Sequence, residues 1–218
     1  IGNLTLKEGD LLSIDGATGR VISGSIPLQE PELSPEYLTL LAWADEYRRL
    51  DVRANADTPE DAAKARSFGA TGIGLVRTEH MFMAQDRLPY VQQMILAETL
   101  EAREDALTHL LPMQENDFYG ILKAMEGYPV CIRLLDPPLH EFLPSLEELL
   151  VETTRLRTLG NDPQTLAQKE LLLKKVRHLH EFNPMLGHRG CRLGITYPEV
   201  DEMQIRAIFE CAAELAKA

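Results

Sequence analysis

The sequence predicts an α/β fold, and more closely a partial (β/α)8 TIM barrel of about the first four βα units, preceded by a short β segment. Two observations carry this prediction. From residue 51 onward, short apolar stretches of strand composition alternate with amphipathic helical stretches, and several of the helical stretches begin at capping residues. Such alternation builds parallel sheets through βαβ units. Because a whole barrel typically needs roughly 250 residues, we expect half of one here and a chain that is cut at both ends.

Residues 1–26 are expected to form a β-hairpin, and residues 27–50 a linker. The run Asp15-Gly16-Ala17-Thr18-Gly19 has turn composition and separates two apolar stretches. A hairpin of this length cannot bury a core alone, so we assign it to the tail of a domain whose body lies upstream. The linker has three prolines among acidic residues and then helical apolar spacing over Tyr37–Leu50, which predicts a short helix.

Residues 51–218 are expected to form the partial barrel. Its predicted strands are Val52–Ala56, Gly72–Thr78, Val130–Leu135 and Met185–Arg189. Its predicted helices are 58–69, Leu88–Leu111, Asp117–Met125, 145–159, 163–182 and Glu199–Ala216. Thr58 before Pro59 is an N-cap signal, and Ser145 with Glu148 forms a capping box. In the last helix one apolar face is formed by Ile205, Ile208, Ala212 and Leu215.

The composition limits the classes of partner. The 218 residues include 22 basic and 34 acidic ones, a net charge of −12, so we expect neither nucleic acid nor a membrane as partner. We expect no membrane-spanning segment and no secretory signal within this chain. Three scattered cysteines, Cys131, Cys191 and Cys211, suit neither a disulfide framework nor a metal site, which favours a reducing cytoplasm, with an organellar form left open.

Arginines lie on each of the predicted strands. Arg77, Arg133 and Arg189 lie at or near the ends of the second, third and fourth strands, and Arg53 lies on the first. Side chains at the carboxyl ends of barrel strands point to one shared mouth, where guanidinium groups would bind phosphate or carboxylate with paired donors. The alternative for each arginine is a surface ion pair with a nearby Asp or Glu, but three at equivalent places favour an anion site.

Two further residues are candidates for supporting this site. Asn55 lies on the first strand beside Arg53, and Asp136 follows the third strand closely. Asp136 is placed to orient Arg133. An equally good interpretation is a turn-forming Asp before Pro137-Pro138.

Three runs of this sequence resemble motifs of the phosphoenolpyruvate-utilising barrel enzymes. Gly-Ile-Gly-Leu-Val-Arg-Thr-Glu-His-Met-Phe (72–82) resembles their second-strand motif, and Asn-Pro-Met-Leu-Gly-His-Arg-Gly (183–190) their fourth. The third strand separates the branches of the family. Here it continues Leu-Asp-Pro-Pro-Leu-His-Glu-Phe (135–142), which is similar to the branch that interconverts ATP, phosphate and pyruvate with AMP, pyrophosphate and phosphoenolpyruvate. The alternatives are phosphoenolpyruvate synthase and an Enzyme I-like phosphotransferase.

The resemblance implies roles for the arginines and partners for the chain. Arg77 and Arg133 are expected to bind the transferred phosphoryl group and phosphoenolpyruvate or pyruvate, with Arg189 as a further substrate-binding residue. Residues 1–26 are expected to be the end of a swivelling phosphohistidine domain, which would be the intramolecular partner of 51–218. A homo-oligomer is also expected.

The same resemblance implies that several groups lie outside this chain. The family's phosphohistidine belongs to a Thr-Ser-His motif that this sequence lacks. Its Mg2+ ligands and its catalytic cysteine come from later strands, beyond Ala218. We therefore expect no catalytic residue and no metal ligand here, and no activity of this chain alone. The alternative from a different class is a non-catalytic anion-binding module.

Overall fold

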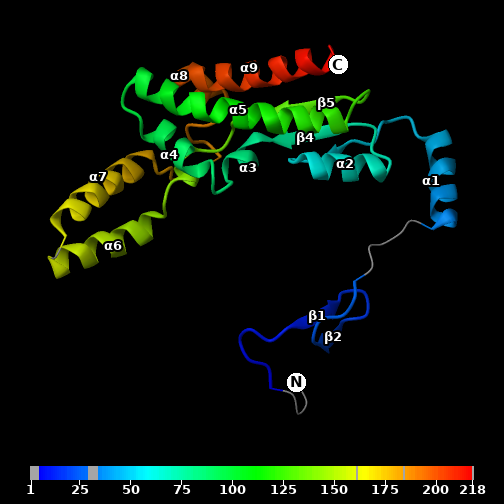
Figure 1. Cartoon of the computed structure of the whole chain (residues 1–218), viewed down its shortest axis with the longest axis horizontal. Helices are drawn as coiled ribbons and strands as arrows, with labels where there is room; N and C mark the ends of the chain where they lie inside the picture. Colours follow the sequence, from blue (N-terminus) through cyan, green and yellow to red (C-terminus); the bar gives the residue numbers. More distant parts are fainter. Residues whose placement is uncertain (1–4, 29–33, 161, 184, 218) are drawn as a thin grey trace. The chain divides into compact units, whose positions relative to one another are not determined.

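The computed structural model describes residues 5–28, 34–160, 162–183 and 185–217, and the chain divides into two compact units, Ile1–Arg49 and Leu50–Ala218 (Figure 1). The first unit contains β1 (Leu12–Asp15), β2 (Arg20–Ser23) and α1 (Pro35–Tyr47). β1 and β2 pair antiparallel, as predicted. Asp15 closes their turn by accepting the backbone N–H groups of Ala17 and Thr18 at 3.0 and 3.3 Å. The assignment of this hairpin to a swivelling domain stays a prediction.

A parallel sheet organises the second unit. Its strands are β3 (Ala54–Asn55), β4 (Ile73–Arg77) and β5 (Val130–Arg133), in that order across the sheet. The connecting helices are α2 (Pro59–Ser67) after β3, and α3 (Thr78–Phe82), α4 (Leu88–Leu96) and α5 (Leu100–Ala124) after β4. Thr58 accepts the N–H of Asp61 at 3.1 Å, which confirms the predicted cap of α2. The unit is mixed α/β as predicted, while its identity as part of a closed barrel stays a prediction.

The elements after β5 are helical. They are η1 (Leu139–Phe142, a 3-10 helix), α6 (Leu146–Leu159), α7 (Pro163–Leu179), α8 (Cys191–Thr196) and α9 (Pro198–Leu215). Figure 1 shows α9 running beside α5, and α6 with α7 as a hairpin. Ser145 caps α6 through the N–H of Glu148 at 3.3 Å, as predicted.

Two apolar clusters hold this unit together. One is formed beside β4 by residues of α2, α5 and α9, and includes Ala62, Ile73, Val76, Phe118, Ile121 and Ala207. The other joins α4 and α5 to the helices after β5, and includes Phe82, Val91, Leu110, Phe142, Val176 and Val200. α5 contributes to both clusters, so it is the central helix of the unit.

The predicted strand Met185–Arg189 is wrong. These residues form turns that lead into α8. The side chain of Asn183 accepts the N–H of Met185 at 3.0 Å, and Glu181 accepts that of His188 at 2.9 Å. Such local side-chain bonds compete with a sheet ladder. Met185 and Leu186 are also 74% and 78% exposed, unlike residues of a buried parallel strand.

The predicted helices Leu88–Leu111 and Asp117–Met125 have wrong boundaries. The first helix ends earlier than predicted, at Leu96, and residues 97–99 separate it from α5. Thr99 is extended and caps α5 by accepting the N–H of Ala102 at 3.2 Å. α5 then continues through Pro112. Proline removes one helical hydrogen bond, but buried residues on both sides of it, such as Leu110 and Phe118, anchor the helix by packing.

The apolar face of α9 proposed from the sequence coincides only in part with its buried face, since Ile208 packs against the cluster beside β4. Ile205 is 44% exposed, and Ala212 is also exposed. The buried residues are Val200, Met203, Gln204, Ala207 and Cys211. These five residues also follow helical spacing. A search for apolar residues alone does not find them, because one of them is a glutamine.

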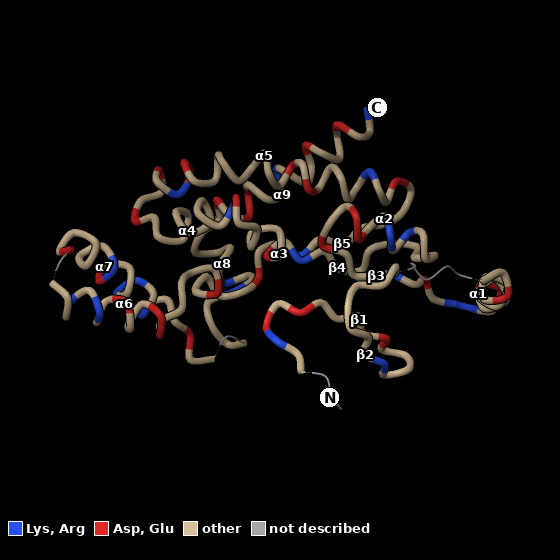
Figure 2. The backbone as a smooth tube through the Cα atoms, turned by 60° about the horizontal axis from the view of Figure 1, so that its bottom comes forward, with Lys and Arg blue, Asp and Glu red and all other residues tan. Residues whose placement is uncertain are grey.

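Charges of both signs are interspersed along the second unit (Figure 2). Among the residues that the structure describes, no helix combines the length and the apolar character needed to cross a membrane.

Candidate functional site

Two of the predicted arginines lie side by side at the carboxyl edge of the sheet. Arg77 is the last residue of β4 and Arg133 the last residue of β5, and the two are partners in the parallel register. Arg189 reaches this edge from the turn before α8 rather than from a strand. All three arginines therefore lie in the second unit: one at the end of β4, one at the end of β5 and one in the turn before α8.

Asp136 joins Arg133 to Arg189. Its Oδ2 lies 3.2 Å from Nη1 of Arg133 and also pairs with Nη2 of Arg189, whose Nε donates to Oδ1 at 3.3 Å. The hydrogen bonds that Arg189 donates to Asp136 raise the pKa of Arg189. Asp136 thus lies against Arg133, and its role in orienting that arginine stays a prediction.

Glu79 is the second carboxylate on Arg133. Its Oε1 pairs with Nη2 of Arg133, and its side chain is 9% exposed. Its Oε2 and the Nε of Arg133 are buried and have no hydrogen-bond partner within the described part of the chain. Both atoms are closed to solvent, whereas the Arg133 side chain as a whole is 38% exposed, so an anion would contact this arginine at its exposed atoms.

Asp57 holds Arg77 in place from the end of β3. Its Oδ1 accepts the backbone N–H of Arg77 at 2.7 Å, and its Oδ2 lies 3.0 Å from Nη2 of the same residue. Nδ1 of His80 lies 2.8 Å from Oδ2 as well. Partial burial raises the pKa of the Asp57 carboxyl, but the hydrogen bonds from Arg77 and His80 together outweigh burial and hold that pKa below its ordinary value.

This lowered pKa predicts a pH-dependent contribution of Asp57 to stability. The unfolded chain binds a proton at Asp57 more readily than the folded chain, so the contribution is present above the ordinary Asp pKa and is lost as pH falls through the folded value. We expect urea denaturation to show a wild-type advantage over Asp57→Asn at pH 7 that shrinks steadily below about pH 4. An advantage of equal size at pH 7 and pH 3 would contradict the ion-pair account.

The two remaining candidates do not join the arginine group. Arg53 packs over the first half of β4, where a Cβ added at Gly72 or Gly74 would lie 3.3 or 3.2 Å from its side-chain atoms. Asn55 is exposed, and within the described residues its side chain makes no hydrogen bond with Arg77 or Arg133. Asp57, which follows β3, is the residue of this segment that contacts the arginine group.

Gly190 permits the close approach of the Arg189 turn to Asp136. Its N–H donates to the backbone carbonyl of Asp136 at 3.1 Å, its φ is +55°, and an added Cβ would lie 3.0 Å from Asp136 Oδ1. Both the left-handed backbone and the contact favour glycine.

Substitution of Gly190 by alanine is expected to destabilise the chain by about 2 kcal/mol and to weaken the Arg189–Asp136 pair. Gly160→Ala is the control for a positive φ in open space, since Gly160 has φ +63° and ψ 12°, whereas Gly190 combines φ +55° with ψ −128°, a conformation that alanine avoids more strongly. We expect chemical denaturation to show a smaller loss for Gly160→Ala. Equal losses for the two variants would show that neither the backbone conformation of Gly190 nor its contact with Asp136 adds to the loss.

Sequence reasoning missed Asp57, Glu79 and His80. A signal was present for each, because Asp57 directly follows the first strand segment and Glu79 and His80 directly follow Arg77. Acidic residues next to strand-end arginines are the expected counter-charges of such a site. Within the described residues, no three His, Cys, Asp or Glu side chains are arranged to bind a metal ion. Asp57, Glu79 and Asp136 are instead each bound to arginine.

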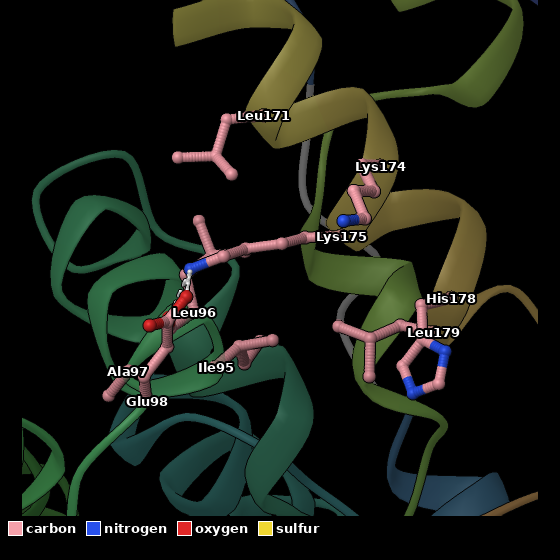
Figure 3. Close-up of a pocket in the computed structure, with 9 residues that line it drawn as sticks. All are labelled: Ile95, Leu96, Ala97, Glu98, Leu171, Lys174, Lys175, His178 and Leu179. Atoms are coloured by element: carbon pink, nitrogen blue, oxygen red, sulfur yellow. Dashed lines mark hydrogen bonds and ion pairs between the residues drawn. The ribbon is translucent and has the colours of Figure 1, made fainter.

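A separate cleft of about 380 Å³ lies between α4 and α7 (Figure 3). Its apolar wall includes Ile95 and Leu179, and Lys175 extends across it to Glu98 at 2.9 Å and to the carbonyl of Leu96 at 3.0 Å. None of the strand-end arginines lines it. The cleft is therefore distinct from the arginine site.

Comparison with known proteins identifies the family. Residues 32–218 match the PEP-binding domain of the PEP-utilising enzymes. The chain belongs to this family. The motif at 72–82, with Arg77 at its centre, and the run with Arg133 both fall within the matched domain.

Relatives of this chain indicate which branch of the family it resembles. It is 56% identical over 218 residues to pyruvate, phosphate dikinase of Entamoeba histolytica, covering 100% of this chain and 24% of that protein. It is 55% identical over 214 residues to the enzyme of the same name from Rhizobium meliloti, covering 98% and 23%. Pyruvate, phosphate dikinase 1, chloroplastic, of Arabidopsis thaliana is 54% identical over 217 residues, covering 99% and 22%. The similarity predicted from the run at 135–142 is confirmed, and the chain spans about a quarter of the length of these relatives.

Proposed function

We propose that this chain is the phosphoenolpyruvate- and pyruvate-binding part of a pyruvate, phosphate dikinase. In this proposal residues 1–26 end the swivelling phosphohistidine domain, 27–50 form the linker, and 51–218 form the first half of the barrel. The observation that carries the proposal is the register pairing of Arg77 with Arg133 at the carboxyl edge of the sheet, with Arg189 joined to them through Asp136.

The site can bind an anion without moving its arginines. Arg77, Arg133 and Arg189 are each fixed by a carboxylate, so little ordering is left to be done when a ligand binds. Transfer of a phosphoryl group requires positioning and neutralisation of charge on its oxygens, and fixed guanidinium groups supply both. The Arg133 side chain is 38% exposed, so its guanidinium group offers donors to a phosphate or carboxylate oxygen from solvent.

The chemistry of the whole enzyme requires groups beyond this site. Mg2+ would neutralise phosphoryl charge, and we propose that its ligands lie outside 1–218, because the carboxylates of this edge are engaged by arginine. We also propose a homo-oligomer, located in the cytoplasm or in an organelle.

The cofactor requirement of the full-length enzyme tests the branch. We expect pyruvate to form from phosphoenolpyruvate with Mg2+ only when AMP and pyrophosphate are both supplied. A requirement for AMP with orthophosphate would indicate a synthase, and phosphorylation of a protein without nucleotide would indicate an Enzyme I-like phosphotransferase. No turnover by a folded full-length protein would leave a non-catalytic anion-binding module.

A further inference from the structure

Gln204 is a fully buried polar residue in the middle of α9. Its exposed fraction is 0%, and both ends of its amide are used. Oε1 accepts the backbone N–H of Leu135 at 2.8 Å, and Nε2 donates to Oε1 of Gln114 at 2.9 Å. A glutamine at such a position costs free energy unless its amide is satisfied, so its placement needs an explanation.

The explanation lies at the end of β5. The strand ends at Arg133, so the sheet ladder supplies no partner for the N–H of Leu135, which is 2% exposed. A buried backbone donor needs an acceptor, and Gln204 supplies it from a helix that lies 69 residues further along the chain. This bond fixes the chain at the residue before Asp136, two residues after Arg133.

The direction of this bond determines the rest of the network. Because the N–H of Leu135 can only donate, Oε1 of Gln204 faces Leu135 and Nε2 of Gln204 donates to Gln114. Gln114, 1% exposed on α5, then directs its own Nε2 to the sulfur of Met81 at 3.2 Å. Met81 lies on α3, the helix that also carries Glu79. The network thus ties the segment of Asp136 to the helix of Glu79, and both of these carboxylates bind Arg133.

We propose that Gln204 is a positioning residue for the anion site. Through Leu135 it sets the backbone from which Arg133 and Asp136 extend, and thereby the place of the Arg133–Asp136–Arg189 group. The inference rests on the proposed function only for its effect on phosphoenolpyruvate, because the positioning itself is measurable without ligand.

The test compares three variants of the 218-residue chain. Gln204→Met removes the bond to Leu135, whereas Gln114→Met removes a second buried glutamine of similar size and leaves that bond in place. In Gln204→Glu, the new carboxyl group in its neutral form supplies both an acceptor for Leu135 and a donor for Gln114. The ligand-free readout is hydrogen exchange of the Leu135 amide by NMR, compared with global unfolding of the same variant.

We expect Gln204→Met to speed Leu135 exchange about tenfold more than Gln114→Met does, and Gln204→Glu to restore protection. We also expect phosphoenolpyruvate affinity, measured by calorimetry, to fall about tenfold in Gln204→Met and less in Gln114→Met. Equal effects of the two methionine variants, or unchanged Leu135 exchange in Gln204→Met, would overturn the proposal. If the wild-type chain binds no phosphoenolpyruvate, the proposed function fails, while the exchange result still decides the positioning role.

Discussion

Replacing Arg133 by alanine is expected to lower the affinity for phosphoenolpyruvate by about ten- to a hundredfold. The guanidinium lies at the centre of the site, contacts Glu79 and Asp136, and belongs to a side chain that is 38% exposed and therefore open to a ligand. Charge-assisted hydrogen bonds of this kind contribute roughly 1.5–3 kcal/mol each, which corresponds to that range of affinity. Calorimetric titration of the chain with phosphoenolpyruvate measures the change.

Two controls separate binding from folding. Arg157→Ala removes an arginine that is 66% exposed and paired with Glu170 on the α6–α7 hairpin, and affinity should not change. Arg133→Ala also leaves the buried carboxylate of Glu79 without a cation, which destabilises the chain. Arg133→Met combined with Glu79→Gln removes that charge. If this double variant is folded and binds as the wild type does, Arg133 is not a binding residue.

Truncation of Phe118 to alanine is expected to reduce the free energy of unfolding by about 3–5 kcal/mol. Phe118 is fully buried on α5, in the cluster beside β4 that also contains Ile73 and Val76. The cavity removes support from the strand that ends in Arg77. For a unit of this size we expect the midpoint of thermal unfolding to fall by roughly 10 °C, as followed by circular dichroism.

Phe209→Ala is the matched control for this prediction. Phe209 lies on α9 and is 70% exposed, so its truncation should change the midpoint by little. A similar fall for both variants would mean that the cluster beside β4 does not form the core described here.

The elements that the sequence predicted well are those with local signals. The N-caps at Thr58 and Ser145 predicted the starts of α2 and α6, because a capping side chain acts within three residues. The turn chemistry of 15–19 predicted the hairpin for the same reason. In contrast, the extent of α5 through Pro112 depends on packing with α2 and α9, which no local pattern encodes.

The candidate site likewise combines residues with a local sequence signal and residues whose role depends on long-range contacts. Arg77 and Arg133 were found because both end a strand and parallel strands share an edge. Arg189 was predicted from the end of a fourth strand, and the structure shows a turn in place of that strand. The contributions of Asp57, Glu79 and Gln204 depend on which side chains meet in space. In the sequence, Gln204 interrupts the apolar pattern of the buried face of α9. Its place there is explained only by its hydrogen bond with Leu135.

The most direct test of the account is titration of the 218-residue chain with phosphoenolpyruvate, followed by NMR of the arginine side-chain Nε–H groups. We expect saturable shifts at Arg77, Arg133 and Arg189, with Arg157 unchanged. Shifts of similar size at Arg157, or none at Arg133 under saturating phosphoenolpyruvate, would contradict an anion site at the carboxyl edge of this sheet.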